Sequence, residues 1–273
     1  ESSMFVDNIK DLSNDIDICI VATKSDVRKS VVEELLSKKN IKNFILEKVA
    51  FQSVRDCLDI IKLTEEKNVN CYVNCPLRLQ PVYEAVGDNL DLTKPTKFIY
   101  EYSDDFKISS SFIHILDLFC WFCSDFDIYI CNNLKEVMES VKHKGFVDFK
   151  GEILVTNSNG HTLHLTQGKN KFTEILKVKN KNIEIYSSEG GIENGINDDR
   201  IGEIVINNQE RYEIPFLWQS YLTAEYVKQI VNDGKCKLPT LNESFKSHKP
   251  MIESFNKFLS DKKGRVITTC PIT

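Results

Sequence analysis

The chain has 273 residues and a formal net charge of −5, with 41% hydrophobic and 27% charged residues. This balance is ordinary for a folded protein and excludes a disordered or fibrous one. The mild negative charge argues against a protein that binds nucleic acid by neutralising phosphates, and no apolar run approaches the roughly 20 residues that span a bilayer. We therefore expect a folded chain with neither a nucleic-acid nor a membrane partner.

Three strand-like segments in the first third of the chain alternate with helix-like segments. Residues 16–22 (IDICIVA) form an apolar stretch of strand length, and Phe44–Leu46 and Cys71–Val73 are typical of two more buried strands. Ser53 is suited to cap the second intervening helix, with Asp56 at the capping-box position. This alternation predicts βαβ units on a parallel sheet, which is half of a doubly wound fold.

The pattern changes to successive hairpins after about residue 125. Asn159-Gly160 is the strongest short hairpin signal and joins residues 149–156 to residues 161–166. Two more hairpins are predicted, 175–178 with 183–186 and 204–206 with 211–214. Two helices close the chain, and Thr240 is suited to cap the second, with Glu243 three residues on. The second half is therefore expected to form an open, mainly antiparallel sheet with helices.

Nine cysteines are scattered singly through apolar segments and are not spaced as a disulfide framework. Buried thiols in a reducing compartment fit this usage better, so we expect a cytoplasmic protein. Cys120 and Cys123 form a lone C-x-x-C pair. A zinc site normally needs two more ligands at comparable spacing, so core packing is favoured over metal or redox use, and no metal site is predicted.

Polar or cationic residues follow each predicted parallel strand, at the edge where ligands bind in open α/β sheets. They are Ala22-Thr23-Lys24, Glu47-Lys48-Val49 and Cys75-Pro76-Leu77-Arg78. A lysine at such a place can donate to a substrate hydroxyl or carbonyl, and burial can lower its pKa. Taken alone, an ordinary loop lysine is the simpler interpretation of Lys48.

His114 and Asp117 are three residues apart and share one face of an otherwise apolar predicted helix. Histidine is the usual general acid or base near neutral pH, and a carboxylate one turn away can orient its ring. A core histidine satisfied by its neighbours is an equally good interpretation. His248 is predicted on the polar side of the last helix, in a structural role.

At these same points the sequence resembles the Gfo/Idh/MocA family, in a branch associated with bacterial surface-polysaccharide sugar oxidoreductases. Ile20-Val-Ala-Thr23 resembles the strand end beneath the nicotinamide, and Leu46-Glu47-Lys48 resembles the Glu-Lys-Pro signature. Residues 75–81 resemble the segment that leads to the substrate side, and His114–Asp117 resembles the His-x-x-Asp motif. With the closing residues 238–248, the resemblance covers nearly the whole chain.

The resemblance implies an oxidoreductase that uses NAD or NADP to move a hydride to or from a carbon of a sugar or nucleotide-sugar. It implies that Lys48 polarises the sugar oxygen and that His114 is the general acid or base. Ala22, Thr23, Glu47 and Lys48 are expected at the cofactor, and Arg78 and Asp117 at the substrate.

The same resemblance assigns the two halves of the chain. Residues 1–88 are expected to be a partial dinucleotide-binding, Rossmann-type domain, and residues 89–273 a substrate and oligomerisation domain with the C-terminal helices packing back. An uncovered sheet face is usually buried by a partner, so we expect a homodimer or homotetramer formed through the open sheet.

Five positions depart from the family's pattern. Ser110 stands where many relatives carry an aspartate, so no Lys-Asp-His triad is expected. Val49 replaces the proline of Glu-Lys-Pro, which we expect to remove a bond that proline can hold in the cis form. Lys24, Arg28 and Lys107 stand where proline, histidine and glycine are common.

The glycine-rich turn that holds the cofactor pyrophosphate is the main departure, because no G-x-G-x-x-G occurs in the sequence. We expect it, with two strands, on the order of 50–60 residues before Glu1. Three interpretations stay open. The chain is most of a nicotinamide-dependent oxidoreductase, or an inactive, truncated relative that binds sugar or a partner protein without cofactor, or a structural protein that oligomerises through its sheet.

Overall fold

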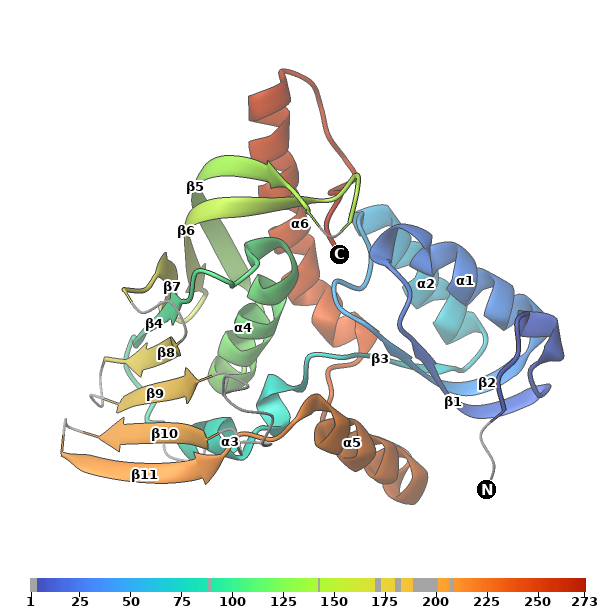
Figure 1. The fold of residues 1–273 in the computed structure, drawn as a ribbon, viewed down its shortest axis with the longest axis horizontal. Coiled ribbons are helices and arrows are strands. Elements are labelled where there is room, and N and C mark those ends of the chain that lie inside the picture. The colour runs from blue at the N-terminus through green and yellow to red at the C-terminus, as the bar shows by residue number, and fades with distance from the viewer. Residues whose placement is uncertain are drawn as a thin grey trace.

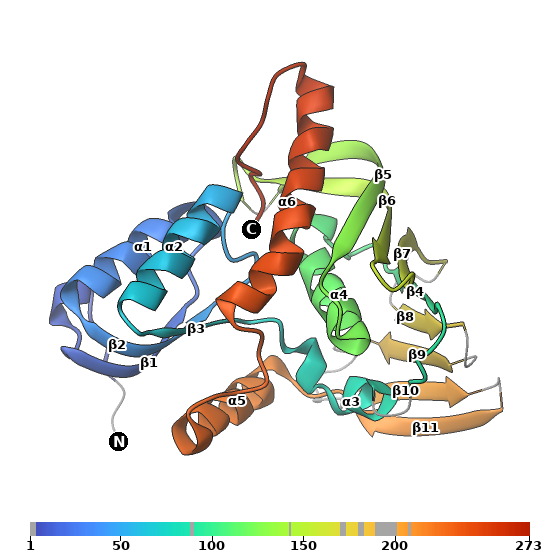
Figure 2. The ribbon, with the colours of Figure 1, turned by 180° about the vertical axis from the view of Figure 1, so that it is seen from behind.

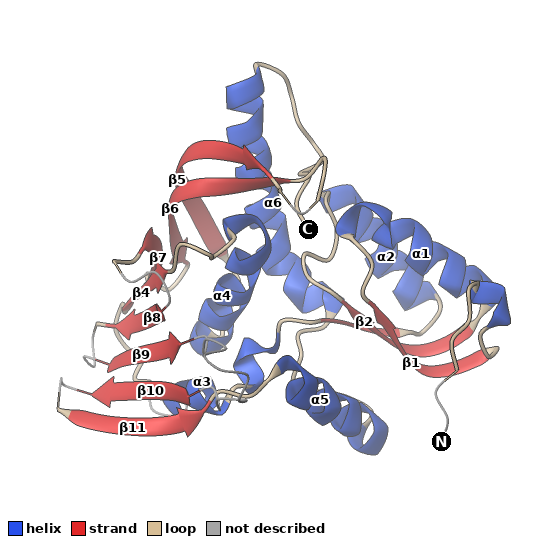
Figure 3. Cartoon of the chain, in the orientation of Figure 1, coloured by secondary structure: helices blue, strands red, loops and turns tan. Residues whose placement is uncertain are grey.

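In a computed structural model, the protein forms two separate sheets with helices between and around them (Figure 1). The structure describes residues 4–87, 90–141, 143–169, 173–179, 183–188, 201–206 and 209–273. Helices α4 (Ile108–Cys123) and α6 (Leu241–Lys263) lie between the two sheets, as the front and back views both show (Figures 1 and 2). Figure 3 separates the helical and strand layers by colour.

The smaller sheet is parallel and has three strands. They are β1 (Asp15–Val21), β2 (Asn40–Leu46) and β3 (Asn70–Val73), paired in that order, which leaves β1 at one edge. Helices α1 (Ser25–Lys38) and α2 (Val54–Glu66) connect them. The Oγ atom of Ser53 accepts a hydrogen bond from the backbone N–H of Asp56 at 3.0 Å, so the predicted cap of α2 is present. The predicted βαβ arrangement is confirmed.

Helices cover both faces of this sheet, as an all-parallel sheet requires. On one face, Val32 and Leu35 of α1 and Ile60 of α2 are buried in the main core. On the other, α5 (Gln219–Asp233) packs Leu222, Tyr226 and Ile230 against strand residues such as Ile45 and Tyr72 in a second apolar cluster. The last two helices thus return to the first part of the fold.

The larger sheet has eight strands in the order β11-β10-β9-β8-β4-β7-β6-β5. They are β4 (Lys97–Tyr102), β5 (Ile128–Glu139), β6 (Val147–Asn157), β7 (Thr162–Gln167), β8 (Thr173–Val178), β9 (Ile183–Ser188), β10 (Ile201–Ile206) and β11 (Glu210–Pro215). All three predicted hairpins are present. Gly160, with φ of +79°, occupies the left-handed position in the first of them.

Two strands of this sheet were not predicted, and one of them is central. β4 pairs in parallel with β7 and antiparallel with β8, so the sheet is mixed although most of its pairs are antiparallel. The parallel pairing needs a crossover, and α4 and the β5–β6 hairpin lie between the two strands in the chain. β4 has no hairpin partner beside it in sequence, which is why hairpin signals alone did not find it.

Helix α4 is the centre of the main core. Most of its residues are buried, including Ile113, Leu116 and Cys120, as expected of a helix packed between two sheets. Short helices η1 (Ile9–Asp11), η2 (Pro76–Leu79) and α3 (Pro81–Gly87) complete the described elements. None of the helices among the described residues is both long and apolar enough to cross a membrane.

The residues after α6 run back between the two halves of the fold (Figure 1). Cys270 and Ile272 are fully buried. The carbonyl oxygen of Ile272 accepts hydrogen bonds from Ser25 Oγ and from Gln52 Nε2, both beside the parallel sheet. The carbonyl oxygen of Pro271 accepts from the N–H of Val147 at 2.8 Å, at the start of β6. This segment therefore joins the two sheets.

We predict that Phe255→Ala lowers the free energy of unfolding by about 3–5 kcal/mol, because it opens a cavity in a fully buried site. Phe255 on α6 packs its ring 4.6 Å from that of Phe149 on β6 and 6.3 Å from that of Phe112 on α4, measured between centroids. Urea unfolding monitored by circular dichroism measures the loss. Phe5→Ala, at a side chain that is 95% exposed, is the matched control and should change stability little.

Candidate functional site

The turns that follow the three parallel strands meet at one edge of the small sheet. The N–H of Glu47 donates to the carbonyl of Val21 at 3.1 Å, and the N–H of Asn74 donates to the carbonyl of Leu46 at 2.8 Å. The side-chain amide of Asn74 also donates to Glu47 Oε1 at 2.6 Å. The sequence-predicted residues Ala22, Thr23, Glu47 and Lys48 therefore lie on neighbouring turns at this edge.

Lys48 is half-buried at this edge. Burial lowers the pKa of its amine, the neighbouring Glu47 carboxylate opposes that change, and the Arg28 charge adds to it. The peptide bond between Lys48 and Val49 is cis, so the expectation that valine would remove a cis bond here is wrong. The carbonyl oxygens of Glu47 and Val49, on either side of this bond, both accept hydrogen bonds from Arg28.

Arg28 is the most deeply buried cation near the site, with 1% of its surface exposed. Its Nη1 donates to the carbonyl of Glu47 at 2.6 Å, to that of Ala50 at 3.0 Å and to that of Val49, and its Nη2 donates to the carbonyl of Thr23. Burial lowers the pKa of this guanidinium to about 10, and the Glu47 charge opposes the change. Arg28 therefore stays charged and holds two turns together.

His114 is placed on α4, where burial first and the Lys48 charge second hold its pKa well below the ordinary value. Its ring is therefore neutral near pH 7. The Nδ1 atom is buried and has no hydrogen-bond partner among the described residues, and the same is true of Thr23 Oγ1. Unpartnered buried polar atoms are rare in folded proteins, and a bound ligand is one way to satisfy them.

Arg78 and Asp117 form a buried ion pair. Arg78 Nε and Nη2 donate to the two carboxylate oxygens of Asp117 at 3.0 and 2.7 Å, and Nη1 donates to Glu243 Oε1 at 2.8 Å. Arg78 is 4% exposed and Asp117 is fully buried. Burial raises the pKa of Asp117 to about 6, and Arg78 works against that rise. The polar atoms of Arg78 and Asp117 that these bonds join are engaged within the protein. The expectation that the two residues contact the substrate stays a prediction.

His248 lies on the buried side of α6, so its predicted place on the polar side of that helix is wrong. It is 1% exposed. Its Nδ1 lies 2.9 Å from the carbonyl oxygen of Ser244, and its Nε2 accepts a hydrogen bond from the N–H of Ala50 at 3.2 Å. The helix turns His248 inward because Met251, Ile252 and Phe255 share that side with it. Its role is structural, and it steadies the turn that carries Lys48.

Three polar residues near the site were missed by the sequence analysis as functional candidates. Asn74 follows β3 directly, and its position after a buried strand was the signal that could have revealed it. Gln219 donates to Asn74 Oδ1 at 3.2 Å from the start of α5, and no local pattern marks it. Gln80 exchanges two hydrogen bonds of 2.9 Å with the backbone of Leu217, which fixes the approach to α5.

The residues at this edge fit the nicotinamide side of a dinucleotide but supply only part of such a site. Thr23 and His114 offer unsatisfied buried polar atoms, and Lys48 offers a cation. The sequence contains no glycine-rich G-x-G-x-x-G turn for the pyrophosphate. The residues of this chain therefore suit the reacting end of the cofactor and not its phosphates.

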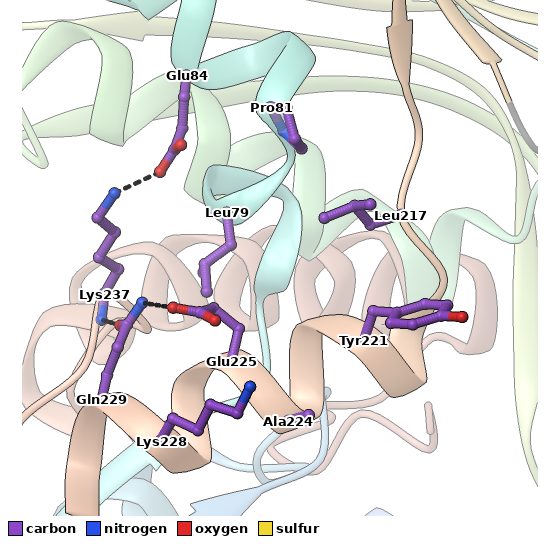
Figure 4. Close-up of a pocket in the computed structure, with 10 residues that line it drawn as sticks. All are labelled: Leu79, Pro81, Glu84, Leu217, Tyr221, Ala224, Glu225, Lys228, Gln229 and Lys237. Atoms are coloured by element: carbon purple, nitrogen blue, oxygen red, sulfur yellow. Dashed lines mark hydrogen bonds and ion pairs between the residues drawn. The ribbon is translucent and has the colours of Figure 1, made fainter. Parts of the chain in front are cut away.

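A separate hollow lies between η2, α3 and α5 (Figure 4). Its volume is about 430 Å³. It is lined by Leu79, Pro81, Glu84, Leu217, Tyr221, Ala224, Glu225, Lys228, Gln229 and Lys237. Its charges are largely paired, since Lys237 Nζ lies 2.5 Å from Glu84 Oε1 and Gln229 donates to Glu225 at 3.2 Å. None of the predicted site residues lines this hollow.

Comparison with known proteins places the fold. No protein-family profile and no curated protein sequence matches the chain. An oxidoreductase from Agrobacterium radiobacter, solved with NAD+, L-tartaric acid and magnesium, superposes with a TM-score of 0.62 at 16% identity over 92% of this chain and 80% of its own. KijD10, a 3-ketoreductase from Actinomadura kijaniata solved with NADP and TDP-benzene, gives 0.61 at 13% identity over 87% and 77%.

A third solved structure with this fold is described as a repressor. It is the super-repressor mutant of Gal80p from Saccharomyces cerevisiae, with a TM-score of 0.62 at 15% identity over 96% of this chain and 83% of its own. The chain thus has the fold of the Gfo/Idh/MocA-type oxidoreductases. Identities this low show the fold alone, and a fold does not fix a function.

We predict that His248 makes a contribution to the free energy of unfolding that is lost as the pH falls from about 6.5 to about 4, while the raised pKa of Asp117 acts in the opposite direction over the same range. Burial lowers the pKa of His248 to about 4, so below pH 6.5 the unfolded chain takes up a proton that the native chain does not. The full loss from this group is roughly 3 kcal/mol, and His114 acts in the same direction. Urea unfolding at pH 7.5, 6 and 4.5 measures it. The stability lost on His248→Gln should therefore shrink as the pH falls from 7.5 to 4.5, because the native advantage of a neutral His248 disappears.

We predict that Arg78→Met lowers the free energy of unfolding by about 3–5 kcal/mol, because it leaves the Asp117 carboxylate buried without its partner. Replacing both residues, as Arg78→Met with Asp117→Leu, should recover part of the loss. The control is Arg211→Met, which removes an ion pair of similar length, 2.8 Å to Glu203, whose arginine side chain is 69% exposed. That change should cost less than about 1 kcal/mol. Equal losses in the two single variants would contradict the prediction.

Proposed function

We propose that the protein is an NAD- or NADP-dependent oxidoreductase acting on a hydroxyl or keto carbon of a sugar or nucleotide-sugar, in surface carbohydrate biosynthesis in the cytoplasm. The observation that carries the proposal is that a half-buried lysine at the sheet edge, Lys48, lies near enough for its charge to act on a neutral histidine of α4, His114, that has an unpartnered ring nitrogen. Clustered groups with perturbed pKa values are typical of catalytic sites.

The role proposed for each of Lys48 and His114 follows from its charge. A bound nicotinamide would supply hydride transfer at the sugar carbon, and the residues of this chain would handle the proton and the charge on the oxygen. Lys48 in its charged form donates a hydrogen bond to the sugar oxygen and stabilises negative charge that develops there. The neutral His114 ring takes the hydroxyl proton as the carbon is oxidised, and returns it when the carbonyl is reduced. The low pKa of His114 keeps the ring neutral before it accepts the proton.

The substrate class rests on the fold and on its neighbours. KijD10 was solved with NADP and TDP-benzene, which supports a nucleotide-linked substrate for this chain. One face of the large sheet lies against α4 and α6, and no helix of the described residues lies on the opposite face in either view (Figures 1 and 2). That uncovered face supports the proposal of a homodimer or homotetramer formed through the sheet.

The first test is a fluorescence titration of the protein with NADH and with NADPH. Saturable binding with a micromolar Kd, about −8 kcal/mol, is expected. Absence of binding to both would overturn the proposal and favour the alternative of a cofactor-free relative that binds sugar or a partner. If the cofactor binds, absorbance at 340 nm with a panel of UDP-, TDP- and GDP-linked sugars and their keto derivatives identifies the substrate.

Lys48→Ala and His114→Ala are each expected to lower kcat by about 10²–10⁴-fold, as loss of an electrostatic or acid–base group does. Lys62→Ala, at an exposed lysine of α2, and His143→Ala are the matched controls and should retain activity. Dinucleotide binding should persist in His114→Ala. Activity that survives both site substitutions would assign the chemistry to other residues.

A further inference from the structure

The turn after β2 is bound from one side by a single guanidinium. Arg28 donates to the carbonyls of Glu47, Val49 and Ala50, which are the residue before Lys48 and the two residues after it. The backbone on both sides of Lys48 is therefore fixed from one point. At 1% exposure, water does not compete for these contacts.

The same guanidinium also reaches the turn after β1. Its Nη2 donates to the carbonyl of Thr23, whose buried hydroxyl has no partner among the described residues. Arg28 therefore links the turn expected at the cofactor to the turn that carries Lys48. Arginine suits this task because its planar fork presents several donors in fixed directions and keeps its charge, whereas a lysine presents one point.

We propose that Arg28 is a positioning residue for Lys48: it locks the turn after β2 against the turn after β1 and so fixes where the Lys48 amine is presented. The proposal rests on the proposed function only in taking Lys48 as the group that faces the substrate.

The charged and titratable groups around Arg28 determine how its removal changes the pKa of Lys48. Glu47 and Asp26 act on Arg28, and the charge of Arg28 acts in turn on Lys48 and on His248. Loss of Arg28 removes a like charge near Lys48 and lets water reach a loosened turn. Both effects favour the protonated amine, so they shift its titration in one direction.

The experiment measures the reactivity of the Lys48 amine directly and needs neither cofactor nor substrate. The protein is trace-labelled with acetic anhydride between pH 6 and 11, and peptide mass spectrometry gives the labelling of Lys48 against the exposed Lys62 as internal reference. In Arg28→Met the titration midpoint of Lys48 should move up by about one pH unit. Arg55→Met, at an arginine of α2 whose side chain is 89% exposed, is the matched control and should leave it unchanged.

Arg28→Lys is the second variant, for the case in which Arg28→Met does not fold. It keeps the positive charge and loses the fork, so a shift of the Lys48 midpoint in this variant reports the positioning rather than the charge. The proposal is overturned if Lys48 titrates in folded Arg28→Lys as it does in the unmodified protein, because a shift seen in Arg28→Met alone then reports only the lost charge. Failure of the oxidoreductase proposal would leave these labelling results unchanged, so the two outcomes are distinguishable.

Discussion

The arrangement of the two halves depends on one buried guanidinium, that of Arg78. It leaves the parallel sheet on η2 and donates to Asp117 on α4 and Glu243 on α6. Both helices lie between the two sheets (Figure 2), so this ion-pair cluster ties η2, α4 and α6 together. A buried charge cannot be left without its partner, and a sliding motion of either helix would do so. The edge that carries Lys48 is therefore fixed relative to His114.

At the candidate site the turn that carries Lys48 is held at several points, while buried polar atoms of three side chains, Arg28 Nε among them, have no partner among the described residues. The turn with Lys48 is held by Arg28, by His248 through the N–H of Ala50 and by Asn74 through Glu47. In contrast, Thr23 Oγ1 and His114 Nδ1 are buried without partners among the described residues. A rigid frame with unsatisfied groups inside it is the organisation expected of a site built before its ligand arrives.

The sequence predicted what depends on local pattern, and it missed what depends on distant contacts. Strands 16–22 and 44–46, the Ser53 and Thr240 caps and the Asn159-Gly160 hairpin follow from side-chain period and turn chemistry, and all are present. β4 was missed because its partner β7 is some sixty residues away and parallel to it. The burial of His248 was misjudged because the polar residues beside it suggested solvent, while the packing of α6 turns it inward.

The route of the residues after α6 has a consequence for synthesis on the ribosome. The carbonyl of Ile272 is hydrogen-bonded to Ser25 and Gln52, so the first turns of the parallel sheet are completed by residues 247 and 220 positions further along the chain. Such long-range closure is slow, because the entropy of the intervening chain must be lost before the contact forms. While the chain is still being made, the Lys48 edge lacks its last contacts and exposes apolar surface, and this half of the molecule matures only after translation reaches residue 272.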